Sequence, residues 1–372
     1  MLKMFKRIIF NRAITFKSRV KNLSYYFFRR RGARILWHAR FKKVFELHPN
    51  YKKRAEKAIE KSHILYWRPF QKFINLATLR LCKNISGVSD PRFIPEEIFM
   101  VDIEPTLNQS PLVEFLTYKS FYNHWFPKGI FPQDYFHNID EEWFDKDLNP
   151  VTINYFLAKS KEFIFPVVLK PNRDSYGGKN IYFPESHEEL RILVKNKKNF
   201  LIQAKINQHS FFEQFNSQGL NTLRVYIYRS VANNQLHIVN ITLRMGVGGS
   251  LDNETAGGIV AMVRKDGFLN GYAVDKYGQK YTAHPDTQTE FNQKIPDFEN
   301  LKNIALEMAS KIFYARLIGL DLCYDTEQRW RMIEINIFGA TIRFAQYHGA
   351  LFFGEFTDEV RDYCLRNHWA KK

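Results

Sequence analysis

The segment from Leu317 to Ile337 constrains the fold more than any other part of the chain. Two runs in which apolar residues alternate with other residues flank Asp325–Arg329, whose composition suits a turn. This pattern predicts an antiparallel β-hairpin. A hairpin centred between Glu327 and Gln328 places Asp321 directly opposite Glu334, with both side chains on one face of the sheet.

Oxygen ligands converge on that face. Asn336 lies two residues beyond Glu334, so it shares the face with Asp321 and Glu334. Two carboxylates side by side repel each other, so something has to offset their charge. Carboxylate and amide oxygens suit Mg²⁺, so Asp321, Glu334 and Asn336 are predicted metal ligands. The alternative is a solvated sheet face that carries acidic residues by chance.

The rest of the second half of the chain is also predicted to be rich in strands. A capping box at Ser186 and Glu189 begins a helix that runs to about residue 195, and a second helix is expected over 298–313. Because short hairpins join most strands, we predict an α+β (mixed α/β) fold with mainly antiparallel sheets. The expected strands are 165–170, 180–183, 200–206, 222–229, 237–244, 258–263, 317–324 and 331–337.

A glycine-rich loop follows the first of these strands. Lys170 ends the strand, and the loop at 174–179 contains Ser175, Gly177 and Gly178. Two glycines allow the backbone to approach an anion closely, and the lysine adds a positive charge for phosphate oxygens. The spacing does not fit a P-loop, and a plain Gly-Gly hairpin turn is the alternative.

Two arginines lie on adjacent predicted strands. Arg224 and Arg244 together suit a phosphate or a carboxylate, although each would equally suit a surface salt bridge. The glycine-rich, polar stretch at 244–258, which includes Asn253, suits a flexible loop beside a site. The sequence His284-Pro285-Asp286 is interpreted as a polar turn rather than a catalytic pair.

Positive charge is concentrated at the start of the chain. Residues 1–84 contain 23 Lys and Arg but three acidic residues, a net charge of +20, whereas the whole chain carries +17. Residues 1–45 combine basic and aromatic residues at near-helical spacing and contain no acidic residue. This composition suits an interfacial helix on anionic lipid. A helical arm packed on the main domain, a nucleic-acid site and a mitochondrial presequence remain alternatives.

Composition excludes several other classes of protein. Of the 372 residues, 45% are hydrophobic and 16% are aromatic, which excludes a disordered chain. Neither a membrane-spanning run nor a clean secretory signal is present. The three cysteines at 82, 323 and 364 are widely spaced, which favours a reducing cytosol over a disulfide framework or a zinc site.

Taken in order, these motifs resemble the ATP-grasp superfamily over roughly residues 90–360. The resemblance rests on the strand ending at Lys170, the glycine-rich loop, the strand at 200–206, and Asp321 with Glu334-x-Asn336. Further motifs resemble sugar-transfer-associated ATP-grasp proteins of bacterial polysaccharide biosynthesis. These are Asn221-Thr222-x-Arg224, Asp252-Asn253 with Gly257-Gly258, His284-Pro285-Asp286-Thr287 and Gly319-x-Asp321.

The resemblance implies a role for each matching residue. Lys170 would contact ATP phosphates, with Lys119 as a second lysine, and the loop with Ser175, Gly177 and Gly178 would close over them. Asp321, Glu334 and Asn336 would hold Mg²⁺. Arg224, Arg244 and Asn253 would act in catalysis. The adenine pocket would be lined by Gln203, Ala204, Lys205 and Ile206; the usual acidic ribose contact is missing, because no acid follows before Glu213.

The implied activity is ATP- and Mg²⁺-dependent joining of a carboxylate to an amine through an acyl-phosphate, in cell-surface polysaccharide synthesis. The expected partners are a small-molecule or lipid-linked glycan acid and an amine, in the cytoplasm or at the inner face of the membrane. A sugar kinase on the same fold is one alternative. A non-catalytic protein that uses its basic arm on nucleic acid or membrane is another, and the retained metal ligands disfavour it.

Four regions are expected from these patterns. A basic helical region at 1–84 precedes the first part of the ATP-grasp region at 85–162. A small lid subdomain at 163–208 and a core with the metal site at 209–365 follow.

Overall fold

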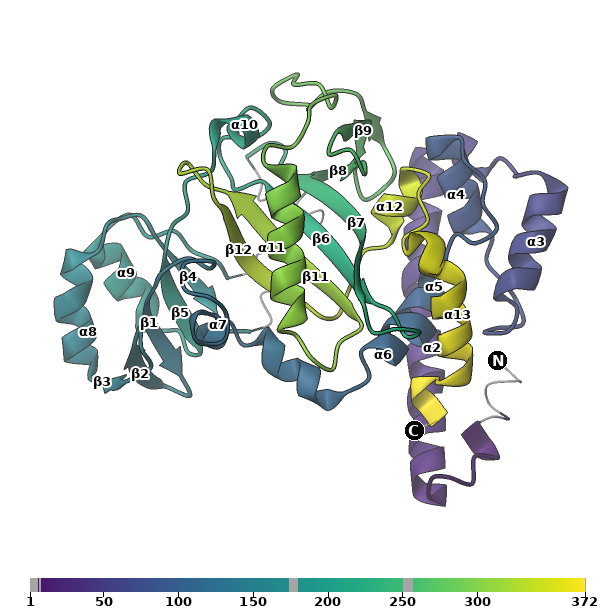
Figure 1. Cartoon of the computed structure of the whole chain (residues 1–372), viewed down its shortest axis with the longest axis horizontal. Helices are drawn as coiled ribbons and strands as arrows, with labels where there is room; N and C mark the ends of the chain where they lie inside the picture. The colour runs from purple at the N-terminus through teal and green to yellow at the C-terminus, as the bar shows by residue number, and fades with distance from the viewer. Residues whose placement is uncertain (1–5, 7, 174–179, 250–256, 372) are drawn as a thin grey trace.

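The computed structural model describes residue 6 and residues 8–173, 180–249 and 257–371. Figure 1 shows a small sheet at one end, a large sheet in the middle and a bundle of helices at the other end. The strands are β1 (Asp134–Ile139), β2 (Glu142–Asp145), β3 (Pro150–Val151), β4 (Val167–Pro171), β5 (Phe200–Ala204), β6 (Thr222–Arg229), β7 (Leu236–Met245), β8 (Ile259–Val263), β9 (Leu269–Val274), β10 (Lys280–Tyr281), β11 (Leu317–Tyr324) and β12 (Trp330–Asn336).

Most helices belong to the two ends of the chain. The α-helices are α2 (Phe16–Leu47), α3 (Lys57–Trp67), α4 (Ala77–Ser86), α5 (Glu96–Ile98), α6 (Glu104–Leu107), α7 (Tyr122–Trp125), α8 (Ile153–Lys159), α9 (His187–Val194), α10 (Ser210–Glu213), α11 (Phe298–Ser310), α12 (Arg343–Tyr347) and α13 (Thr357–Arg366). Shorter helical turns are η1 (Pro49–Lys52), η2 (Phe99–Ile103), η3 (Pro111–Thr117), η4 (Lys119–Phe121), η5 (Ser160–Glu162), η8 (Gly354–Phe356) and η9 (Trp369–Lys371).

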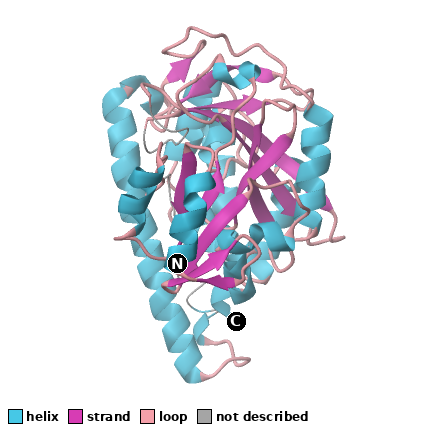
Figure 2. Cartoon of the chain, turned by 90° about the vertical axis from the view of Figure 1, so that its left-hand side faces the viewer, coloured by secondary structure: helices cyan, strands magenta, loops and turns pink. Residues whose placement is uncertain are grey.

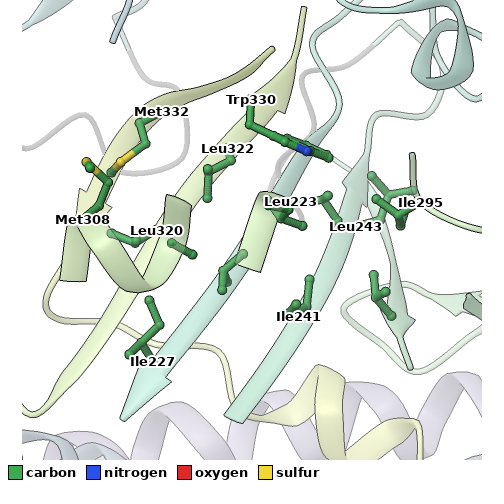
Figure 3. Close-up of a cluster of buried hydrophobic side chains, with 14 of the residues drawn as sticks. Leu223, Ile227, Ile241, Leu243, Ile295, Met308, Leu320, Leu322, Trp330 and Met332 are labelled. Atoms are coloured by element: carbon green, nitrogen blue, oxygen red, sulfur yellow. The ribbon is translucent and has the colours of Figure 1, made fainter. Parts of the chain in front are cut away.

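The large sheet carries the main hydrophobic core. Its strand order is β10-β9-β8-β7-β6-β11-β12, and every neighbouring pair is antiparallel. Leu223 of β6, Leu320 of β11 and Met308 of α11 are buried in one cluster, which Figure 3 shows from the side of the sheet covered by α11. Because side chains alternate along a strand, the residues between these apolar positions point to the other face.

The small sheet has its own core. Its order is β3-β2-β1-β5-β4, again with antiparallel pairs throughout. Phe156 of α8 and Leu190 and Val194 of α9 pack against it. The expected lid subdomain began at residue 163, yet the sheet takes three of its five strands from residues 134–151.

The N-terminal region is helical, as predicted, and it is integrated into the fold. Its long helix α2 lies beside α13 and projects from the body of the molecule at its starting end (Figures 1 and 2). The buried residues of α2 recur every three or four positions and form one stripe, namely Tyr26, Arg30, Ala33, Trp37, Phe41 and Val44. Arg30 forms a buried ion pair with Asp102, which also binds His368 near the C-terminus.

The fold class predicted from the sequence is confirmed. Strands β6 and β11 have the predicted bounds, and the predicted helix at Ser186 begins there, because the Ser186 side chain accepts a hydrogen bond from the Glu189 amide. The expected strand at 180–183 is wrong: Tyr182 forms a single bridge to Leu169. No helix in the described ranges is both long and apolar enough to span a bilayer.

Candidate active site

The two acidic residues of the β11–β12 hairpin lie opposite each other. Asp321 pairs with Glu334 and Gly319 pairs with Asn336, which is the register predicted from the sequence. A bulge follows Asp321, so the register shifts by one residue toward the turn. The side-chain nitrogen of Asn336, Nδ2, lies 3.3 Å from Asp321 Oδ2. The three predicted metal ligands are therefore brought together on one face.

Two arginines neutralise Asp321. The Arg224 side chain makes a two-pronged contact, through Nε to Oδ1 and through Nη2 to Oδ2 at 2.7 Å. Arg244 Nη1 lies 3.2 Å from Oδ2. Burial alone would raise the pKa of Asp321, but the two guanidinium groups hold this pKa below its usual value. The carboxylate thus stays ionised inside the protein.

Glu334 has a different cationic partner. Lys119 Nζ in η4 lies 2.8 Å from Glu334 Oε1, and the Lys119 side chain is almost completely buried. The backbone amide of Lys119 donates to the carbonyl of Asn172, just after β4 (2.7 Å). The two like charges of the hairpin are therefore offset by separate cations. Lys119 therefore links the end of β4 in the small sheet to the face of the large sheet that carries the predicted metal ligands.

Lys170 is a buried ammonium group. It lies in β4 with 6% of its surface exposed, and its side-chain ammonium makes no hydrogen bond or ion pair with any residue that the structure describes. Desolvation, followed by the nearby charge of Lys119, lowers the pKa of Lys170 to about 8. Glu334 and Asp134 oppose that shift. A buried cation without an anionic partner is costly and favours an anionic ligand.

The segment predicted to line an adenine pocket connects the two sheets. Gln203 and Ala204 end β5, and Lys205 and Ile206 continue as irregular chain, with Lys205 exposed. The carbonyl of the next residue, Asn207, accepts a hydrogen bond from the Thr326 amide in the β11–β12 turn (3.1 Å). The segment therefore runs from the small sheet to the hairpin that carries Asp321.

Sequence reasoning missed Asp134. This residue begins β1 opposite Gln203, whose side-chain nitrogen lies 2.5 Å from Asp134 Oδ1. Asn123 donates to the other carboxylate oxygen at 2.9 Å. Asp134 is thus a buried acid beside the predicted nucleotide segment. A strand assignment at 134–139 was the one signal that would have pointed to it.

Two further features shape this face. At Gly319, an added Cβ would lie 3.2–3.4 Å from atoms of Tyr226, Arg224 and Asn336, so a glycine leaves room for the arginine. His284 Nε2 donates a hydrogen bond to the carbonyl of Gly246 (2.9 Å), and Asp286 accepts one from the Gly248 amide (2.7 Å). The His284–Asp286 turn therefore supports the glycine-rich loop after β7, as a polar turn would.

Several predicted site residues lie outside the described residues. These are Ser175, Gly177 and Gly178 of the first glycine-rich loop and Asn253 of the second. The structure places the ends of both loops at the site, because β4 carries Lys170 and β7 carries Arg244.

The donor set of the hairpin fits a magnesium ion. Two carboxylates and one side-chain amide supply hard oxygen ligands, and Mg²⁺ commonly takes one or two carboxylates and completes its shell with phosphate and water. Within the described ranges, no group of three or more His, Cys, Asp and Glu residues could hold a metal ion, so a magnesium site here would depend on Asn336 and on ligand oxygens beside the two carboxylates. Asp321 also binds Arg224 and Arg244, so a metal ion would share or displace those contacts.

Comparison with solved structures gives distant likenesses. One is N5-carboxyaminoimidazole synthase from Aspergillus clavatus with ADP and 5-aminoimidazole ribonucleotide: 8% identity, TM-score 0.38, covering 63% of this chain and 50% of that one. The biotin carboxylase domain of Hydrogenobacter thermophilus 2-oxoglutarate carboxylase has 12% identity and a TM-score of 0.40, with coverages of 66% and 47%. An L-amino acid ligase from Bacillus licheniformis has 12% identity and a TM-score of 0.37, with coverages of 64% and 44%.

This chain therefore spans about half the length of these structures. Likenesses with such TM-scores carry no inference about activity. Among curated proteins, none matches this chain.

A family model gives the more specific result. The model described as "Sugar-transfer associated ATP-grasp" matches residues 185–351. This range contains Arg224, Arg244 and all three predicted metal ligands, and it ends before α13. The match agrees with the resemblance seen in the motifs over this part of the chain.

Proposed function

We propose that this protein is an ATP- and Mg²⁺-dependent carboxylate–amine ligase. The observation that carries the proposal is the buried ammonium of Lys170, which has no ion-pair partner among the described residues and lies beside the Lys119–Glu334 pair and the Asp321 cluster. Such a group needs an anion at the boundary between the two sheets, where the ATP-grasp resemblance expects the phosphates of ATP.

The net positive charge of the site supports binding of a polyphosphate ligand. Lys119, Lys170, Arg224 and Arg244 are four cationic side chains, whereas Asp321 and Glu334 are two carboxylates. The balance stays positive even when Asp134 is included. Positioned positive charge stabilises transferring phosphoryl groups, because little covalent chemistry is required of the protein itself.

Mg²⁺ would be held by Asp321, Glu334 and Asn336, and when bound it would neutralise phosphate charge and orient the phosphate groups. Lys119 and Lys170 would hold phosphate oxygens from the side of the small sheet. Arg224 and Arg244, which are packed against Asp321, would hold the oxygens of the substrate carboxylate or of the transferred phosphoryl group.

The reaction proceeds in two balanced steps. A carboxylate oxygen of the substrate bonds to the γ-phosphorus of ATP, the bond to the β,γ-bridging oxygen breaks, and ADP leaves. The amine nitrogen then bonds to the acyl carbon, the bond from that carbon to the phosphate oxygen breaks, and phosphate leaves. The proton released by the nitrogen passes to solvent.

The proposed substrates are a sugar acid and an amino acid or another amine, within cell-surface polysaccharide synthesis in the cytoplasm. The family description, which refers to sugar transfer, supports this assignment. A sugar kinase would use the same phosphate site but transfer the phosphoryl group to a hydroxyl. The mass of the product distinguishes the two, because a ligase condenses acid and amine whereas a kinase adds phosphate.

The first experiment is a thermal-shift titration with ATP, with and without Mg²⁺. At 100 times Kd, binding to the folded state alone adds about 2.7 kcal/mol, which raises the unfolding midpoint measurably. Glu334→Gln should remove the Mg²⁺-dependent part of the shift. Glu327→Gln, in the exposed turn of the same hairpin, should keep it. A full shift in Glu334→Gln would exclude the metal assignment, and no shift in the unaltered protein at millimolar ATP would exclude the nucleotide site.

A second experiment tests the ligase step. Uronic acids and amino acids are supplied with ATP, and ADP release is measured together with the product mass. Hydroxylamine, which captures acyl-phosphates as hydroxamates, should yield a hydroxamate in the presence of the acid alone. A phosphorylated sugar with no hydroxamate would favour the kinase.

A further inference from the structure

We propose that the projecting N-terminal end of this protein docks on an anionic lipid bilayer. This surface, the N-terminal tip, consists of the described residues from Lys6 to Lys21. The inference goes beyond ATP-dependent ligation and does not depend on it. The tip lies at the end of the molecule opposite the small sheet that carries Lys170 (Figure 1).

The tip exposes large apolar side chains that no other part of the described chain covers. Phe10 is 73% exposed and Phe16 is 74% exposed. Ile9 and Val20 beside them are 43% and 48% exposed. A single exposed apolar residue is ordinary, but four within twelve residues at a projecting end form a patch, and such patches mark interaction sites.

Hydrogen bonds hold this patch in a defined shape. Thr15 caps α2 by accepting from the Ser18 amide (3.1 Å). Arg19 Nη1 donates to the carbonyl of Ile9 (2.9 Å), which ties the preceding turn to the helix. Asn11 donates to the carbonyl of Lys371 (2.5 Å), so the tip is also attached to the C-terminal end of the chain. The patch is therefore part of the fold rather than a loose tail.

Positive charge surrounds the apolar patch. Residues 6–21 contain six Lys and Arg and no acid, and Lys6, Arg12, Lys17 and Lys21 are exposed. The same pairing continues along the outer row of α2, where exposed residues recur every seven positions at Lys21, Phe28, Ile35 and Lys42. Phe28 is 66% exposed and Ile35 is 61% exposed.

An anionic bilayer satisfies both properties at once. Its headgroups attract Lys and Arg, and the adjoining acyl region accepts Phe, Ile and Val to a shallow depth. Nucleic acid would satisfy the positive charge but would leave Ile9 and Val20 exposed to water. In a second copy, the five described Lys and Arg residues of one tip would face the same five of the other, and like charges oppose such an interface.

The test is flotation of the full-length protein with vesicles of phosphatidylcholine alone or with 30% phosphatidylglycerol. Binding is expected to the anionic vesicles alone and should weaken between 0.1 M and 0.5 M salt. Phe10→Ser with Phe16→Ser, and separately Lys17→Glu with Lys21→Glu, should each lower binding about tenfold or more. The matched controls, Ile164→Ser and Lys161→Glu, alter exposed residues far from the tip and should bind normally.

Each variant must keep the unfolding midpoint of the unaltered protein, so that lost binding reports the surface. The proposal is overturned by equal binding to neutral vesicles, by no binding to either, or by equal loss in the control variants. It is also overturned if the tip variants lose DNA binding or self-association while vesicle binding stays unchanged. The ATP-induced thermal shift should be the same in all tip variants, so failure of the ligase proposal would be seen separately.

Discussion

At the scale of single residues, the site is organised by which cation faces which acid. Asp321 is held by two arginines and Glu334 by Lys119, and Lys170 alone has no anion among the described residues. Pairing keeps Asp321 ionised in spite of burial, whereas desolvation and the nearby charge of Lys119 lower the pKa of Lys170. The charge of Lys170, which no described anion balances, therefore favours an anionic ligand.

Replacing Lys170 by methionine is expected to stabilise the ligand-free protein while abolishing ATP binding. The folded-state pKa of about 8 lies below the usual value of 10.5, so the unfolded chain binds more protons between these values. Stability contributed by Lys170 therefore rises with pH across that window, and below pH 8 its buried charge destabilises the fold. At pH 7, Lys170→Met should raise the unfolding free energy by up to roughly 3 kcal/mol.

Urea unfolding at pH 7 and at pH 10 measures this difference, which should shrink at the higher pH. Lys205→Met, at an exposed position in the segment after β5, serves as the control and should show no pH-dependent gain. A Lys170→Met protein that is less stable at pH 7 would contradict the assignment of Lys170 as an unpartnered charge.

At the scale of elements, the position of the hairpin depends on contacts to its ends. The segment after β12 is held by helix α6, where Glu104 Oε1 accepts a hydrogen bond from the Ala340 amide (2.7 Å). Asn108 donates to the carbonyls of Leu317 and Ile337, at the start of β11 and just after β12. These contacts fix the end of the strand that carries Asn336.

Glu104→Gln is expected to stabilise the protein at alkaline pH. Burial raises the pKa of Glu104 from 4.5 to about 7, so the folded state binds more protons between these values and loses stability as pH rises through them. A glutamine stays neutral and keeps the acceptor for Ala340. At pH 8 its unfolding free energy should exceed that of the unaltered protein by up to roughly 3 kcal/mol, and the difference should vanish near pH 4.

Denaturant unfolding at both pH values checks this prediction, with the exposed Glu114→Gln as the control. If the two variants behave alike at pH 8, Glu104 does not carry a buried charge.

At the scale of the whole molecule, the basic N-terminal region contributes buried residues to the core and exposed residues to the molecular surface. One face of α2 is buried against the helices at 77–107 and the C-terminal residues, through Tyr26, Trp37 and the Arg30–Asp102 pair. The opposite face carries the exposed basic and aromatic residues. The packed arm predicted from the sequence therefore corresponds to one face of α2, and the membrane surface that we propose would use the opposite face.

Arg30→Met is expected to lower the unfolding free energy by about 3–5 kcal/mol, because it leaves the buried Asp102 without its strongest partner. Arg31→Met, one position along the same helix, changes an exposed side chain and should have an effect of about 0.5 kcal/mol or less. Thermal or urea unfolding measures both. Equal losses of unfolding free energy in the two variants would mean that the Arg30–Asp102 ion pair does not stabilise the packing of α2.

Taken by itself, the sequence determined the features that depend on near neighbours. Alternation along 317–337 predicted the pairing of Asp321 with Glu334, the face shared with Asn336 and the antiparallel class of sheet, because side-chain direction repeats every two residues in a strand. The sequence did not predict strands β1, β2 and β3. These strands are short, and Asp140 and Glu141, which join β1 to β2, both adopt the left-handed backbone conformation.

The tertiary structure alone decided which distant groups meet. Lys119, predicted by resemblance as a second phosphate lysine, has no local pattern that marks it, yet it reaches Glu334 across the two sheets. Asp134 of β1 contacts Gln203 of β5, which is adjacent in the small sheet but distant in sequence. Arg30 likewise contacts Asp102, which also binds His368. Local periodicity encodes which face a residue occupies, whereas long-range packing decides which faces come together and therefore which charges stay unpaired.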